Sequence, residues 1–205
     1  MIIGITGGVG TGKSSVLQLL KDEFGAVLII ADDIARDLME PPYPGYYAVV
    51  SHFGTEILQE TGEQKDPPID RGKLSQIVFR DPEKLQLLNH LIHPLVREEI
   101  ISLISRYQAE GTELIVIETA LLLQAGYQDL VDELWVLHTD YSVRLERLKA
   151  SRGYSKEKTD SIIRNQLPDE EMEAAADFVI DNSKDLEDTR QQILRYLDNR
   201  IPIRK

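Results

Sequence analysis

Short apolar runs separated by amphipathic stretches dominate the hydrophobic pattern of the chain. Most of these runs are unbroken rather than alternating, which predicts buried β-strands. They are Ile2–Thr6, Ala26–Ile30, Glu113–Glu118, Glu133–His138 and Asp177–Asp181. Strands that are apolar along their whole length are typical of a parallel sheet with helices on both faces.

Helical patterns lie between the predicted strands. The segment Ser14–Phe24 places apolar residues on one side, and Gly25 provides a stop signal at its end. A second amphipathic helix is predicted over Asp188–Asn199. The repeating order of strand and helix predicts an α/β fold, with a doubly wound, parallel five-stranded sheet.

The gap between the second and third strands, about residues 32–111, is too long for a simple crossover. Its first half contains the loop-forming sequences Pro41–Gly45 and Pro67-Pro68. Its second half predicts a helix that starts at Asp81-Pro82 and runs to Leu91, followed by a break or kink at His93-Pro94 and a second helix to Gln108. We expect a helical insertion, and binding of a second substrate is favoured over simple structural bulk.

Composition narrows the classes of function. The chain has 205 residues, 42% hydrophobic content and a net charge of −12. That size suits one core with insertions, and the acidic charge argues against a nucleic-acid-binding surface. The absence of cysteine excludes disulfides, thiol nucleophiles and cysteine-bound zinc. No signal segment or run long enough to span a bilayer is visible, so we expect a cytoplasmic protein without a membrane partner.

A phosphate-binding loop is the strongest motif. The sequence from Gly7 to Ser14, GGVGTGKS, has the G-x-x-x-x-G-K-S spacing between a predicted strand and a predicted helix. Glycines let backbone amides approach phosphates closely, and the helix N-terminus adds positive potential. Lys13 is expected to bridge the β- and γ-phosphates, and Ser14 to bind Mg²⁺. The motif indicates a nucleoside triphosphate but leaves the phosphate acceptor open.

Candidate carboxylates follow the second and third strands. Asp32 and Asp33 are adjacent, so they cannot share one role, because neighbouring side chains point in different directions on a strand or a helix. We expect Asp32 to close the second strand and Asp33 to be a first-turn or capping acid of the helix that follows. A kinase needs a carboxylate at the acceptor hydroxyl, and ligands bind at the carboxyl ends of such strands. Glu118 ends the third strand, where it either helps to hold Mg²⁺ through water or caps a loop.

A basic cluster follows the fourth strand, although the chain is acidic overall. It comprises Arg144, Arg147, Lys149, Arg152, Lys156, Lys158 and Arg164. Arginine suits phosphate because its guanidinium forms paired hydrogen bonds, so a closing lid is favoured over a solvated helix face paired with Glu146 and Glu157. A GTPase is disfavoured, because Asn182-Ser183-Lys184-Asp185 does not match the guanine-reading order Asn-Lys-x-Asp.

These motifs together resemble the dephospho-CoA kinase family, over nearly the whole chain. The similar segments are GITGGVGTGKSSV, the acidic segment ADDIAR, LNHLIHPLVREEI from Leu88, RNQLPDEE from Arg164 and ADFVIDNS from Ala176. A phosphate loop alone is common to many families. Its combination with the His-Pro and Val-Ile-Asp-Asn sequences is far more specific.

The resemblance implies transfer of phosphate from ATP, with Mg²⁺, to the ribose 3′-hydroxyl of dephospho-CoA. It implies a phosphate-loop core (1–40, 111–140 and 173–205), a substrate-binding insertion (41–110) and a lid (141–172). Asp32 and Lys13 are the implied catalytic residues. Implied ATP contacts are Gly8, Val9, Gly10, Thr11, Gly12, Lys13, Ser14, Ser15 and Asn182, with lid contacts from Arg144, Arg147 and Arg152. Implied substrate contacts are Arg71, Leu74, His93 and Arg97, although a packing role for His93 is equally supported by its sequence context.

Several positions depart from the family pattern. Ile30 stands where an acid is common, Ser151 replaces a lid arginine, Ile162 replaces another, and Ala120–Gln124 differs from the usual Pro-Leu-Leu-x-Glu. Two rival functions therefore stay open. One is a kinase for another small molecule, such as a nucleoside. The other is a nucleotide-binding module without turnover. The oligomeric state does not follow from the sequence.

Overall fold

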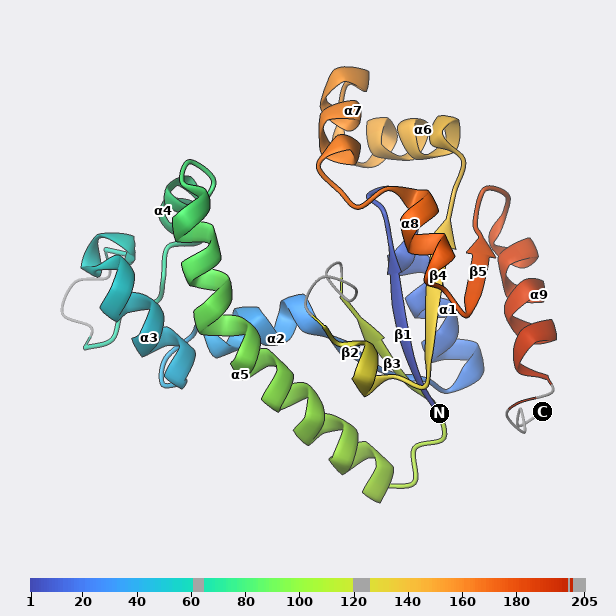
Figure 1. The fold of residues 1–205 in the computed structure, drawn as a ribbon, viewed down its shortest axis with the longest axis horizontal. Coiled ribbons are helices and arrows are strands. Elements are labelled where there is room, and N and C mark those ends of the chain that lie inside the picture. Colours follow the sequence, from blue (N-terminus) through green and yellow to red (C-terminus); the bar gives the residue numbers. More distant parts are fainter. Residues whose placement is uncertain (61–64, 120–125, 199, 201–205) are drawn as a thin grey trace. The chain divides into compact units, whose positions relative to one another are not determined.

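A computed structural model describes residues 1–60, 65–119, 126–198 and 200. Its centre is one five-stranded parallel sheet in the order β2-β3-β1-β4-β5 (Figure 1). The strands are β1 (Ile2–Gly7), β2 (Val27–Ile30), β3 (Ile115–Glu118), β4 (Glu133–His138) and β5 (Phe178–Asp181). All five predicted strands are confirmed within a few residues at each end. The central strands β1 and β3 are buried at every position, as their apolar sequences require.

Two compact units make up the chain. The first combines residues 1–29 with residues 104–205, and the second spans residues 30–103. The second unit is thus wider at its N-terminal end than the predicted insertion 41–110, because the acidic segment after β2 makes its contacts there. None of the helices in the described ranges has the length and apolar composition needed to cross a membrane.

Helices of the first unit flank the sheet and follow the phosphate loop and the later strands. They are α1 (Lys13–Phe24), α6 (Tyr141–Arg152), α7 (Lys156–Arg164), α8 (Asp169–Ala174), α9 (Leu186–Leu197) and the 3₁₀ turn η2 (Gln128–Leu130). The predicted helices 14–24 and 188–199 correspond to α1 and α9. Gly25 ends α1 in a left-handed conformation with φ 66°, as its stop signal predicts.

Two packed clusters fix the later part of this unit. Met172 of α8 is buried with Leu134 and Val136 of β4, which anchors the end of the predicted lid to the sheet. At the β5 edge of the sheet, the rings of Phe178 on β5 and Tyr196 on α9 stack with centroids 3.9 Å apart. These contacts hold the segments on both sides of α6 and α7 against the core.

The second unit is helical. It contains α2 (Ala31–Leu38), α3 (Pro44–Phe53), η1 (Thr55–Ile57), α4 (Arg71–Val78) and most of α5 (Pro82–Ala109). The predicted separation into two helices at His93-Pro94 is wrong, because α5 is one helix of 28 residues with Pro94 inside it. Pro94 removes only one backbone donor, and the buried stripe of Ile92, Val96 and Ile100 continues through it at four-residue spacing.

The acidic pair Asp32-Asp33 also differs from expectation. Asp32 does not close the second strand, because β2 ends at Ile30 and α2 begins at Ala31. Both aspartates lie in the first turn of α2, where the helix dipole favours negative charge. Asp33 pairs with Arg36 at 2.7 Å, one turn later, as a first-turn acid would.

Candidate active site

The phosphate loop joins β1 to α1. Gly12 precedes α1 with φ 87°, and Gly10 has φ 80°, a region that side chains rarely tolerate. The Lys13 ammonium donates to the Gly7 carbonyl at 2.6 Å, so this cation lies against the loop itself. Ser14 and Ser15 follow in the first turn of α1, with exposed side chains. The loop, the lysine and the helix N-terminus therefore have the arrangement that the motif predicts.

Glycines of this loop also let other elements pack against it closely. A Cβ on Gly8 would lie 2.4 Å from Arg144 Nη2, and one on Gly10 would lie 3.0 Å from the Leu148 side chain. A Cβ on Gly12 would lie 2.4 Å from Asn182 Nδ2. The glycines thus admit α6 and the segment after β5, in addition to giving phosphate access to the backbone.

The Thr11 carbonyl anchors the loop to the sheet. It accepts from Asn182 Nδ2 at 2.7 Å and from Thr139 Oγ1 at 3.1 Å, with Arg147 Nη1 farther away at 3.5 Å. The other end of the Asn182 amide accepts from Thr189 at 2.8 Å, and both residues are buried. Asn182 therefore supports the loop, which sequence reasoning missed when it gave this residue only a contact with ATP.

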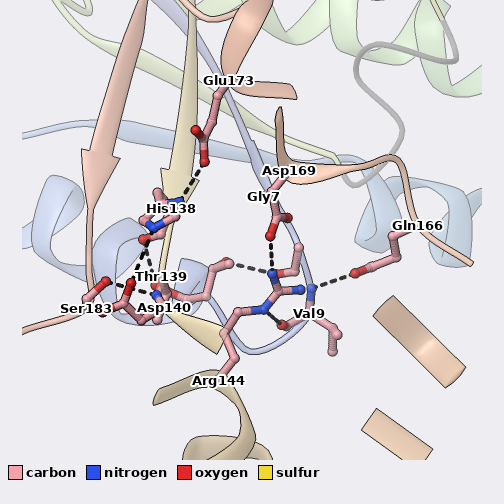
Figure 2. Close-up of polar contacts among 12 residues, drawn as sticks. Gly7, Val9, His138, Thr139, Asp140, Arg144, Gln166, Asp169, Glu173 and Ser183 are labelled. Atoms are coloured by element: carbon pink, nitrogen blue, oxygen red, sulfur yellow. Dashed lines mark hydrogen bonds and ion pairs between the residues drawn. The ribbon is translucent and has the colours of Figure 1, made fainter. Parts of the chain in front are cut away.

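Arg144 lies deepest among the lid cations. Its side chain is 2% exposed, and its Nε donates to the Val9 carbonyl at 2.9 Å (Figure 2). Its Nη1 pairs with Asp169 at 2.6 Å. Its Nη2 is buried beside Gly8 and has no hydrogen-bond partner in the described part of the chain. A buried, unpaired guanidinium donor beside a phosphate loop is suited to bind an anion.

Of the other two predicted lid contacts, one lies near the phosphate loop and one does not. Arg147 lies near the loop, as its contact with Thr11 shows. Arg152 does not join the cluster, because it is exposed at the end of α6 with its guanidinium 5.9 Å from the Tyr154 ring centroid. At the position of one departure, the Ser151 hydroxyl donates to the Arg147 carbonyl at 2.6 Å. Another departure, Ala120–Gln124, falls outside the described residues.

A histidine and a carboxylate join the end of β4 to α8. His138 Nδ1 lies 2.6 Å from Glu173 Oε1, and Asp140 lies 3.7 Å from the other ring nitrogen (Figure 2). Burial lowers the pKa of His138, but the hydrogen bond and charge of Glu173, with Asp181 and Asp140, outweigh it. The net pKa of His138 is raised, so the imidazolium is favoured.

The residues expected to bind Mg²⁺ in this unit are a hydroxyl and a carboxylate. Ser14 presents an exposed hydroxyl, and Glu118 is a buried carboxylate at the end of β3, beside the strand that leads into the loop. The described residues include no cluster of three or more histidines, cysteines or carboxylates for a metal cage. Few protein ligands together with phosphate oxygens suit Mg²⁺, so these residues fit that ion.

The predicted substrate residues lie on two helices of the second unit. Arg71 on α4 pairs with Glu40 at 2.8 Å, and Leu74 is buried. His93 and Arg97 are one turn apart on α5, which places them on the same face. Burial, followed by the charge of His90, lowers the pKa of His93 and favours its neutral form. Arg71, His93 and Arg97 are polar side chains of this unit, whereas the burial of Leu74 indicates packing.

The same unit contains a basic cavity that sequence reasoning missed. Its volume is about 510 Å³, within the range of small-molecule sites. The lining residues come from α4, the connection that follows it and the start of α5: Lys73, Gln76, Ile77, Arg80, Asp81 and Lys84. Asp81 is engaged in capping, because its carboxylate accepts from the Glu83 and Lys84 amides. The cavity therefore has a local excess of positive charge in an acidic protein.

Asp32 has a different environment. Its side chain is exposed at the start of α2 and makes no hydrogen bond or ion pair with other described residues. An exposed carboxylate with unused acceptor capacity is chemically able to take a proton from a bound hydroxyl.

Comparisons with known proteins agree with the motifs. A family model described as "Dephospho-CoA kinase" matches residues 1–188. A "Dephospho-CoA kinase" of Carboxydothermus hydrogenoformans is 44% identical over 96% of this chain and 92% of its own. A crystal structure from Thermus thermophilus is similar with TM-score 0.80 at 28% identity, covering 98% of this chain and 97% of that one. A "Dephospho-CoA kinase" of Campylobacter jejuni is similar with TM-score 0.70 at 26% identity, covering 97% and 96%.

The family match covers the phosphate loop, the helical unit and residues 141–172, and these relatives are similar over nearly their whole length. The chain belongs to the dephospho-CoA kinase family.

Proposed function

We propose that this protein transfers the γ-phosphoryl group of ATP to the ribose 3′-hydroxyl of dephospho-CoA, giving CoA and ADP. The carrying observation is Arg144, whose buried and unpaired Nη2 lies beside Gly8 of the phosphate loop. A buried guanidinium donor without an acceptor is costly, and a triphosphate would supply the missing acceptor. Family membership supports dephospho-CoA as the phosphate acceptor.

The nucleotide half of the site is assigned to the first unit. Backbone amides of the phosphate loop other than the Val9 N–H, which donates to Gln166, bind the phosphates together with the Lys13 ammonium. Arg144 and Arg147 offset charge that develops during transfer. Asn182 and Thr139 hold the loop in shape through the Thr11 carbonyl. Ser14 and Glu118 would hold Mg²⁺, which supplies charge neutralisation at the phosphates when bound.

The acceptor half is assigned to the second unit. Asp32 is the proposed base, and Arg71, His93 and Arg97 are proposed contacts to the acceptor. The basic cavity suits the diphosphate of dephospho-CoA, because Lys73, Arg80 and Lys84 all line it. The small apolar contribution of Ile77 would face the neighbouring, uncharged part of that molecule.

Transfer then proceeds as an in-line displacement. The 3′-oxygen forms a bond to the γ-phosphorus while the bond from phosphorus to the ADP oxygen breaks. The proton of the hydroxyl passes to the Asp32 carboxylate. Lys13 and Arg144 stabilise the negative charge on the transferred group and on the departing ADP.

An acceptor panel tests the proposal. The protein is incubated with ATP and Mg²⁺ and with dephospho-CoA, adenosine, another nucleoside or no acceptor, and ADP release is measured in a coupled assay. We expect rapid release with dephospho-CoA alone, and mass spectrometry should find one added phosphate. Equal rates with adenosine would indicate a different small-molecule kinase. ATP binding without any product would indicate a nucleotide-binding module.

A further inference from the structure

The backbone N–H and the carbonyl of Val9 are both held by residues of the predicted lid, 141–172. Its N–H donates to Gln166 Oε1 at 2.9 Å, and its carbonyl accepts from Arg144 Nε at 2.9 Å (Figure 2). Gln166 lies between α7 and α8, and Arg144 lies on α6. Two segments far from the loop in sequence therefore converge on the backbone of one residue of the phosphate loop.

Asp169 completes this arrangement. Its carboxylate accepts from Arg144 Nη1 at 2.6 Å, and it lies at the first residue of α8, only three positions after Gln166. The guanidinium is planar, so fixing Nε on Val9 and Nη1 on Asp169 also fixes the direction of Nη2. That remaining nitrogen is the one beside Gly8, buried and without a partner among the described residues.

We propose that Gln166 and Asp169 are positioning residues for phosphate transfer: Asp169 aims Arg144 Nη2 at a phosphate oxygen of the nucleotide, and Gln166 fixes the Val9 peptide on which Arg144 rests. This inference rests on the proposed function and adds two residues that act through others. Neither is required to touch the substrate. Its consequence is that the end of the lid controls the geometry of the phosphate loop.

A double-mutant cycle on Arg144 and Asp169 tests the first part. Asp169→Ala should lower kcat/KM for ATP about tenfold, because the guanidinium loses its fixed orientation. Asp169→Glu should restore part of that loss. In an Arg144→Ala background, Asp169→Ala should have little further effect, because the residue through which it acts is gone. Glu170→Ala, an exposed neighbour on the same helix, is the matched control and should be neutral.

Hydrogen exchange tests the second part. Gln166→Ala should speed exchange of the Val9 amide at least several-fold, because that N–H loses its acceptor, and should lower kcat. Asn165→Ala, its exposed neighbour, should change neither. Thermal unfolding of each variant shows whether the fold is retained. Gln166→Glu keeps an acceptor for the Val9 amide, so its exchange should stay slow. This variant keeps the inference testable if Gln166→Ala is unstable.

The opposite results would overturn the inference. Additive effects of Arg144→Ala and Asp169→Ala, or tighter ATP binding after Asp169→Ala, would mean that Asp169 does not act by aiming Arg144. Unchanged Val9 exchange in Gln166→Ala would remove Gln166. ATP affinity measured by calorimetry and exchange of the Val9 amide need no phosphate acceptor. They can therefore be measured even if dephospho-CoA is not the substrate, so the two failures stay distinguishable.

Discussion

The phosphate loop and the helical unit of residues 30–103 differ in how their polar residues are held. Around the loop, Asn182, Thr139 and Arg144 are buried and fixed by hydrogen bonds to loop carbonyls. In the helical unit, the side chains of Asp32 and Arg80 are exposed and have no hydrogen bond or ion pair with other described residues. The nucleotide side is preorganised, and the acceptor side has solvated groups that a ligand must order.

This contrast has an energetic consequence. A preorganised donor costs little reorganisation when charge develops on a phosphate, so its loss should reduce the rate strongly. A solvated side chain pays entropy when it engages a ligand, so its loss should have a smaller effect on affinity. Asp32 is the exception that we expect, because its proposed role is proton transfer.

The largest expected effect is at Lys13. Lys13→Ala should reduce kcat roughly 10²–10³-fold, the scale of losing one preorganised charge-stabilising group. It should also weaken ATP binding, measured by calorimetry with Mg²⁺. Lys21→Ala removes the same charge from the last turn of α1 and should leave the rate unchanged. Full activity of Lys13→Ala would contradict the assignment of the phosphate loop.

Asp32 should follow, and its neighbour provides the control. Asp32→Asn should lower kcat by roughly 10²-fold, the scale of general-base catalysis, with ATP affinity nearly unchanged. Asp33→Asn removes the adjacent first-turn acid and its pair with Arg36, and should change the rate little. If both variants lost the same activity, the asymmetry between these two carboxylates would be wrong.

Loss of the basic cavity should have an intermediate effect on acceptor binding. The double variant Arg80→Ala/Lys84→Ala should raise KM for dephospho-CoA about tenfold, because charged hydrogen bonds to the diphosphate are lost. The KM for ATP and kcat at saturation should stay near those of the unmodified enzyme. Lys21→Ala/Arg195→Ala, which removes the same charge from the first unit, serves as the matched variant. An equal rise in KM in this control variant would mean that the loss of net positive charge, and not the cavity, causes the effect.

The smallest expected effect concerns pH and the pair of His138 with Glu173. The pKa of His138 is raised in the folded protein, so its stabilisation is fully present below the unfolded pKa of about 6.5. The stabilisation is lost as the pH rises through the folded pKa. The difference in Tm between the unmodified protein and Glu173→Gln should therefore shrink from pH 6 upward. If Tm changed with pH in the same way in both proteins, the pair of His138 and Glu173 would not be the cause of the pH dependence.

Much of the fold was predictable because its signals are local. Continuous apolar runs marked all five strands, and Gly25 marked the end of α1. The failures are also local signals that tertiary structure overrode. Pro94 predicted a break or kink followed by a separate second helix, but burial of Ile92, Val96 and Ile100 along one face carries α5 through it as one helix. Asp32 read as the end of a strand, but the chain already enters α2 at Ala31.

The candidate site also contains features that the local sequence predicts and features that it does not. The spacing of Gly7, Gly12, Lys13 and Ser14 identified the phosphate loop, because those residue types have few other uses in that order. The sequence also placed arginines after β4, but it could not distinguish Arg144, which is buried at the loop, from Arg152, which is exposed. Gln166, Asp169 and Thr139 gave no local signal, because their roles depend on contacts with residues far away in the chain.

By itself, therefore, the sequence determined the order of strands and helices, the phosphate loop and the family. These follow from periodicity, from glycine conformations and from a contiguous motif, all of which are local along the chain. Only the tertiary structure decided that the Thr11 carbonyl is held by Asn182 and Thr139, and that the Val9 peptide is held by Arg144 and Gln166. The physical reason is that these hydrogen bonds join residues more than 100 positions apart, whose meeting depends on how the sheet and its helices pack.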